Sequence, residues 1–279
     1  MSYKTILVNA ELSPRAEHIV ACAARIAEAE QAHLVGLSST GINPLVYQCN
    51  AAAPGVPLLP DDLSGFIAGA GRALEQFETV AVRHGAPSCE RRITDDGLPD
   101  SLVLGARYCD LVVVGQPDPR QHPPLSSAPF PHELVLNSPV PVLVIPWAGQ
   151  FDTIGSRVLV GWDGSLAATR AIHAALPLLR RARLVTLAIV DPEHNFGAHG
   201  AQPGADMAQY LARQGVTVDV ATRQAASADG EDLLSLAADH GADLLVMGCY
   251  GHSRFRELVM GGATRTVLHS MTLPVLMSQ

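Results

Sequence analysis

Four glycines near the C-terminus are spaced like those of a loop that binds phosphate. Gly248 and Gly251 follow the apolar run 244–247, and Gly261 and Gly262 precede a short segment of helical character. Glycine lets backbone N–H groups approach an anion, and the start of a helix adds unpaired N–H groups and the positive end of the helix dipole. The pattern predicts that this segment holds the phosphates of a nucleotide.

Two strand ends have to lie beside this loop to complete a site. The apolar run 158–160 is followed by Gly161 and Asp163, and the strand-like run 183–190 ends at Val190. In an open parallel sheet, ligands bind at the carboxyl ends of the strands, where the order of the strands reverses. An acid there can accept a hydrogen bond from a ribose or a base, and a backbone edge can pair with an adenine. We therefore expect these positions and the glycine loop to converge on one crevice.

The chain contains two copies of one pattern. Each copy has an apolar run followed by an acid and a serine, a later run that ends in glycine, and a last apolar run after proline. The paired segments are 6–13 with 158–165, 109–115 with 242–248, and 141–145 with 274–277. Self-similarity of this kind indicates a duplicated structural unit.

The strand-like runs are short and show little polar alternation, which is typical of parallel strands buried between two layers of helices. We predict an α/β fold of two tandem doubly wound domains, each with a five-stranded parallel sheet and helices on both faces. Domain 1 is expected over 1–146 and domain 2 over 157–279, joined by a linker. Ser13 and Ser165 are predicted to be helix N-caps, and Pro177 to kink or end its helix.

Composition narrows the class of protein. The formal net charge is −8 and no stretch forms a basic stripe, which argues against nucleic acid as a partner. No apolar stretch approaches the roughly 20 residues that cross a bilayer, and the chain begins in a strand-like run without a leader. The five cysteines are scattered, which disfavours a disulfide framework or a structural zinc site. We expect a soluble cytoplasmic protein.

On these motifs the chain resembles a tandem universal stress protein over nearly its whole length. The nucleotide signature of that family is Gly, two residues, Gly, nine residues, Gly, then Ser or Thr. The spacing from Gly248 through Gly251 to Gly261 meets it, whereas Gly262 stands in place of the hydroxyl residue. Either Thr264 supplies a hydroxyl instead, or Gly262 donates only its N–H.

The resemblance implies a fold like that of the adenine nucleotide alpha hydrolases, and it implies ATP as the ligand, alone or with Mg²⁺. It places Asp163 against the adenosine and the Val190 backbone against the adenine, with Gly161 in the turn before Asp163. The residues that it implies around the ribose and phosphates are Met247, Gly248, Gly251, His252, Gly261, Gly262 and Ala263. His252 and Arg254 are either phosphate contacts or solvated loop residues.

The first copy lacks the glycine loop. After Gly115 the chain continues with prolines, which have no N–H for an anion, and Asp118 stands where the second copy has Gly251. Glu11 keeps the position of the acid. We predict that the first domain does not bind the nucleotide or binds in an altered way.

Plainer readings accompany these predictions. Asp163 can serve as a capping residue, Cys249 as a small residue in a turn rather than a redox thiol, and His194 and His199 as solvated residues rather than metal ligands. The sequence lacks a GxxxxGK[ST] loop, a GxSxG elbow and an HExxH motif, so a dedicated ATP-driven enzyme is not expected.

The sequence therefore predicts an ATP-binding sensor or regulator of the stress response, with slow and incidental hydrolysis at most. Its expected partners are an adenine nucleotide, an unidentified protein and a second copy of the chain in a dimer. Two alternatives stay open: a stress scaffold that works by protein contacts without nucleotide, and a slow ATPase or phosphotransferase that uses His252 or Cys249.

Overall fold

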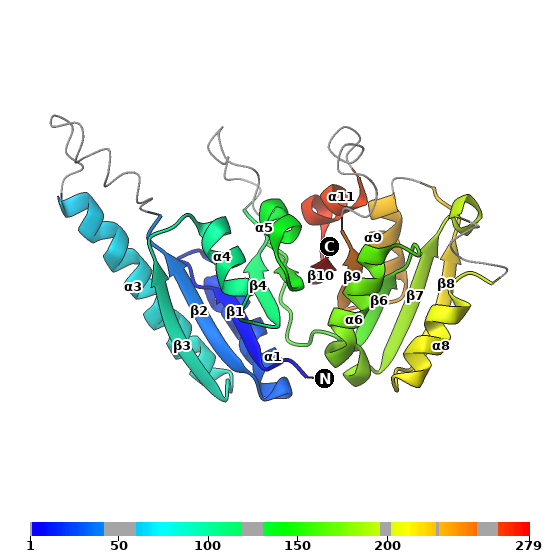
Figure 1. Ribbon diagram of the computed structural model, residues 1–279, viewed down its shortest axis with the longest axis horizontal. Helices are drawn as coiled ribbons and strands as arrows, with labels where there is room; N and C mark the ends of the chain where they lie inside the picture. Colours follow the sequence, from blue (N-terminus) through cyan, green and yellow to red (C-terminus); the bar gives the residue numbers. More distant parts are fainter. Residues whose placement is uncertain (1, 42–59, 119–130, 196–201, 227–228, 250–261) are drawn as a thin grey trace. The chain divides into compact units, whose positions relative to one another are not determined.

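The computed structural model describes residues 2–41, 60–118, 131–195, 202–226, 229–249 and 262–279 (Figure 1). It divides into two compact units, residues 3–115 and residues 116–279. Each is an α/β unit, which confirms the predicted fold class. None of the helices in the described ranges is long and apolar enough to span a membrane.

The first unit has four parallel strands that alternate with helices. In chain order its elements are β1 (Thr5–Asn9), α1 (Ala16–Glu30), β2 (His33–Ser39), α3 (Pro60–Arg83), β3 (Ser88–Thr94), α4 (Leu98–Ala106) and β4 (Leu111–Gly115). The strands lie in the order β3-β2-β1-β4, with parallel pairing throughout. Because crossovers between parallel strands are right-handed, the reversal between β1 and β4 places α1 and α3 on one face and α4 on the other.

The second unit repeats this plan and extends it. Its elements are α5 (His132–Asn137), β5 (Val142–Ile145), β6 (Arg157–Gly161), α6 (Leu166–Arg181), β7 (Leu184–Val190), the 3₁₀ turn η1 (Pro192–Asn195), α8 (Ala205–Arg213), β8 (Val218–Arg223), α9 (Asp229–Asp239), β9 (Leu244–Gly248), α11 (Ala263–Ser270) and β10 (Val275–Ser278). The strand order is β5-β10-β9-β6-β7-β8. All neighbours from β10 to β8 are parallel, whereas β5 runs antiparallel to β10, with Leu143 opposite Leu276.

The predicted repeat is visible in matching hydrogen bonds at the start of β1 and β6. The Asp110 carboxylate accepts the backbone N–H groups of Lys4 and Thr5 at 2.7 and 2.9 Å. At the corresponding place, the Asp243 carboxylate accepts three backbone N–H groups from residues 155–157, each at 3.0 Å. Hydrogen bonds to a charged acceptor are about twice as strong as neutral ones, so these aspartates tie the first and fourth strands of each copy together.

The two predicted N-caps have different outcomes. Ser165 caps α6, because its hydroxyl accepts the N–H of Ala168 at 3.1 Å. The prediction for Ser13 is wrong: α1 begins two residues later than expected, with Arg15 as its N-cap. The Ser13 hydroxyl instead accepts the Arg15 N–H at 3.3 Å and donates to Glu11 at 2.6 Å. An acid two residues upstream therefore binds this serine and holds it in the turn before the helix.

Pro177 does not end its helix, contrary to one of the two expectations for it. It lies inside α6, which continues to Arg181, and its ring is buried. Proline has no N–H, so α6 lacks one backbone hydrogen bond at this position. The helix tolerates this loss because burial of its apolar face contributes more stability than one backbone hydrogen bond.

Candidate functional site

The ends of three strands meet at one edge of the sheet in the second unit. β6 lies between β9 and β7, with Val160 opposite Val246 and Gly161 opposite Ala188. The carboxyl ends of β6, β7 and β9 are therefore neighbours. From β6 the chain proceeds outward to β7 and β8, and then returns to the other side at β9 and β10. This is the reversal of strand order at which open α/β sheets bind ligands.

Asp163 stands two residues beyond the end of β6 and is half-buried. Its Oδ1 accepts the N–H of Ser165 at 2.9 Å, and Ser165 in turn caps α6. Asp163 is therefore not the helix cap that the plainer reading proposed; it holds the turn before the capping residue Ser165. A carboxylate has about four acceptor positions, so holding this turn leaves it able to accept a hydrogen bond from a hydroxyl as well.

Packing requires the glycine at the end of β9 and leaves little room beside the one at the end of β6. A Cβ atom on Gly248 would lie 2.4 Å from the nitrogen of Ala168, in the first turn of α6. A Cβ atom on Gly161 would lie 3.3 Å from Leu233 Cδ2 and 3.7 Å from Met247 Cβ. The start of α6 therefore rests directly on the backbone of β9. Sequence reasoning assigned Gly248 to phosphate binding alone and missed this second reason for a glycine.

The other described candidates present mainly backbone to the crevice. Met247 is only 5% exposed, so its side chain belongs to the core. Val190 is half-buried at the end of β7, opposite Arg223. Asp191, the next residue, has a φ of 51°, a left-handed conformation that aspartate tolerates better than most residues.

Gly262, Ala263 and Thr264 form the start of α11. Gly262 is the N-cap, and its carbonyl oxygen accepts the N–H groups of Arg265 and Thr266 at 2.9 and 3.2 Å. Among the residues that the structure describes, no side chain makes a capping hydrogen bond to this helix. Thr264 is buried at 2% exposure, so its hydroxyl does not lie at the surface of the helix start. The backbone rather than a hydroxyl is what this terminus offers to an anion.

Four candidates lie outside the described residues: Gly251, His252, Arg254 and Gly261. His199 does so too. In the described ranges, no group of three or more His, Cys, Asp or Glu side chains could hold a metal ion. Cys249 is a free cysteine at 1% exposure, which fits the plainer reading of a small residue in a turn.

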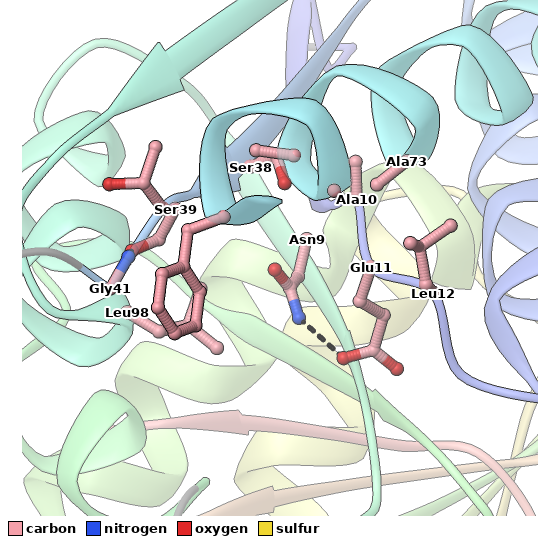
Figure 2. Close-up of a pocket in the computed structure, with 13 residues that line it drawn as sticks. Asn9, Ala10, Glu11, Leu12, Ser38, Ser39, Gly41, Ala73 and Leu98 are labelled. Atoms are coloured by element: carbon pink, nitrogen blue, oxygen red, sulfur yellow. Dashed lines mark hydrogen bonds between the residues drawn. The ribbon is translucent and has the colours of Figure 1, made fainter. Parts of the chain in front are cut away.

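The first unit contains a cavity at the corresponding strand ends, which sequence reasoning missed. Its volume is about 350 Å³, and it is lined by residues that follow β1 and β2 and by one face of α3 (Figure 2). Glu11, the counterpart of Asp163, lies in this lining. The signal that could have revealed it is the set of small residues at 69, 70 and 73 of α3.

Comparison of the sequence with known protein families gives a match in the second half of the chain. The sequence model of the Universal stress protein family matches residues 156–279. Universal stress protein Slr1230 of Synechocystis sp. is 31% identical over 153 residues, 51% of this chain and 48% of that protein, so the chain spans about half the length of this curated relative.

Among solved structures, a universal stress protein from Archaeoglobus fulgidus DSM 4304 shares the fold over 99% of this chain and 96% of its own, with a TM-score of 0.72 at 15% identity. A universal stress protein in complex with cAMP covers 53% of this chain and 100% of its own, at 23% identity and a TM-score of 0.39.

Proposed function

We propose that this chain is a universal stress protein, on the match of residues 156–279 to that family, and that its second half binds ATP, alone or with Mg²⁺, as the ligand of a stress sensor or regulator. The observation that carries the proposal is the meeting of Asp163, Val190 and Gly248 at the carboxyl ends of three adjacent strands. The proposed domains are residues 1–146 and 157–279, with the nucleotide in the second.

The chemistry of these positions suits an adenine nucleotide. The Asp163 carboxylate is an acceptor for a ribose hydroxyl, and the backbone at Val190 can pair with the edge of a base. The start of α11 has no side-chain cap from the described part of the chain and carries the positive end of the helix dipole, which favours phosphate. Mg²⁺, when present, would be held mainly by phosphate oxygens, as is usual for nucleotide complexes.

ATP regulates a partner only if it binds one conformation more tightly than another. We infer that nucleotide binding changes a surface that a protein partner contacts. The protein acts in the cytoplasm as a dimer, and hydrolysis is slow and incidental to this role.

One observation favours a second candidate, a scaffold that works by protein contacts without nucleotide. The close approach of α6 explains Gly248 without any ligand. Under this alternative the strand ends retain their glycines for packing alone.

Calorimetric titration of the purified protein with ATP, after removal of any copurified nucleotide, tests the proposal. We expect one site per chain in the wild type and in Glu11→Gln, which changes the corresponding acid of the first copy. Asp163→Ala should weaken binding by roughly tenfold to a hundredfold, as expected for loss of a hydrogen bond to a charged group. Gly251→Glu should abolish it, because it adds charge and bulk beside the phosphates.

Absence of ATP binding by folded wild-type protein would refute the nucleotide proposal and favour the scaffold. Two sites per chain, one of them lost in Glu11→Gln, would show instead that the first copy also binds ATP.

A further inference from the structure

The cavity of the first unit has the size of a small-molecule site. At about 350 Å³ it falls within the range of roughly 300–1,000 Å³ that is typical of ligand pockets. It lies between the carboxyl ends of β1 and β2 and the first half of α3, with Leu98 of α4 completing the lining.

Small residues of α3 create the space. Phe77 packs against β2 so closely that a Cβ atom on Gly36 would lie 2.5 Å from its ring. One turn earlier, α3 places Ala73, and before it Gly69, against the strand ends. The helix is thus held at close range by Phe77, while the absent side chains upstream leave the cavity open. Phe66, 57% exposed, adds an aromatic group to the lining.

The polar side of the cavity combines the Glu11 carboxylate with an amide and a hydroxyl. The Asn9 Nδ2 group donates to Glu11 at 2.9 Å, and Figure 2 shows the two side chains joined by this bond. Asn9 and Ser38 are only 3% and 4% exposed. In the described ranges, neither the Asn9 oxygen nor the Ser38 hydroxyl is among the fully buried polar atoms that lack a partner. The Asn9 oxygen accepts a hydrogen bond and the Ser38 hydroxyl accepts or donates one, so both suit a ligand that donates hydrogen bonds.

The charge of the lining selects against phosphate. Glu11 is the one charged residue in the lining that the structure describes, and Lys, Arg and His are absent from it. A second carboxylate lies close by, because the hydroxyl of the lining residue Thr40 donates to Asp95 Oδ1 at 2.9 Å. The Arg72 guanidinium lies at the edge of the lining, with Nη2 4.0 Å from the position of a Cβ atom on Gly69. Two carboxylates against one guanidinium leave an excess of negative charge near the cavity, which attracts a cation more than an anion.

From this combination we propose that the first unit binds a small ligand of its own, a cationic amine or amidine carried on a flat apolar group and free of phosphate. The nitrogen donates to the Glu11 carboxylate and the Asn9 oxygen, and the apolar group lies against Phe66 and the small residues of α3. This site is separate from the ATP site proposed in the second half and does not depend on it.

Benzamidine is a suitable probe, because its amidinium matches a carboxylate and its ring is flat and apolar. Benzamide and benzoate have the same shape with neutral and negative groups. Calorimetric titration of the full chain should show one benzamidine site, at least tenfold tighter than benzamide, and no binding of benzoate. Glu11→Gln should weaken benzamidine binding by roughly tenfold or more, the loss of one charge-assisted hydrogen bond, while Asp163→Asn should not change it.

A matched pair of variants locates the site. Gly69→Leu places a side chain in the lining of the cavity, whereas Gly71→Leu lies in the same helix outside the lining. Both remove a glycine from a helix interior, so both should fold. Gly69→Leu should abolish benzamidine binding and Gly71→Leu should retain it.

Benzoate binding as tight as benzamidine binding would overturn the proposal, as would full binding by Gly69→Leu or equal losses in Glu11→Gln and Asp163→Asn. Saturating ATP should leave the benzamidine affinity unchanged. A chain that fails to bind ATP but still binds benzamidine would refute the proposed function and support this one.

Discussion

Replacing Gly248 with alanine should destabilise the second unit by an amount that the geometry sets. The added Cβ atom would lie 2.4 Å from the nitrogen of Ala168 and 2.6 Å from the carbonyl carbon of Ala167. Ordinary contact begins near 3.4 Å, so the start of α6 has to move by about 1 Å. Because the obstructing atoms are backbone, no rotation of a side chain can relieve the clash.

Overpacking a well-packed interior lowers the free energy of unfolding by about 1–3 kcal/mol. Because the obstructing atoms belong to the backbone, we expect Gly248→Ala to lower it by about 2–3 kcal/mol. For a unit of this size, such a loss lowers Tm by roughly 4–12 °C. Both tryptophans of the chain, Trp147 and Trp162, lie in the second unit. Thermal or urea unfolding followed by tryptophan fluorescence therefore reports on the unit that carries the change.

Gly115→Ala is the matched control, since Gly115 occupies the same position of the first copy. There the nearest atom to an added Cβ is Ile19 Cδ1, at 2.5 Å, the far end of a side chain that can rotate away. We expect a loss of less than about 1.5 kcal/mol, measured by circular dichroism. An unchanged Tm for Gly248→Ala, or a larger loss for Gly115→Ala, would refute the packing argument.

Two further predictions follow from titratable groups. Burial, reinforced by the charge of Arg265, lowers the pKa of His132, so this side chain stabilises the fold above its ordinary pKa of 6.5 and loses that contribution as the pH falls through the lowered value. His132→Asn should therefore lose less stability than wild type between pH 8 and pH 5 in urea unfolding; equal losses in the two proteins would contradict the assignment. Burial also raises the pKa of the Cys109 thiol to about 12, so iodoacetamide at pH 8 should alkylate it on the order of a thousandfold more slowly in the folded than in the urea-unfolded chain. Mass spectrometry of the Cys109 peptide measures both rates, and rates within tenfold of each other would show that the thiol is accessible.

Local pattern was sufficient for the architecture. Apolar runs such as 158–160 and 244–247 are buried on both faces, and this burial needs no knowledge of the partner strands to be predicted. The expected convergence of the strand ends in an open parallel sheet requires β6 and β9 to be neighbours, and the pairing of Val160 with Val246 confirms it. Ser165 was likewise predictable as a cap because a cap depends on residues within one turn.

Ser13 shows where a local pattern fails even at short range. It has the same position in the repeat as Ser165, yet its hydroxyl donates to Glu11 and helix α1 starts later. A glutamate at the place of an aspartate, followed by proline after the serine, was enough to change the turn.

The sequence by itself determined the strands, the duplication and the edge of the sheet at which a ligand can bind, because each depends on the burial or spacing of residues close together in the chain. Only the tertiary structure decided that β5 runs antiparallel to β10, that α6 rests on Gly248, and that α3 leaves a cavity beside Glu11. These features arise from side chains that are far apart in sequence and come within contact distance only after the helices have packed on the sheets.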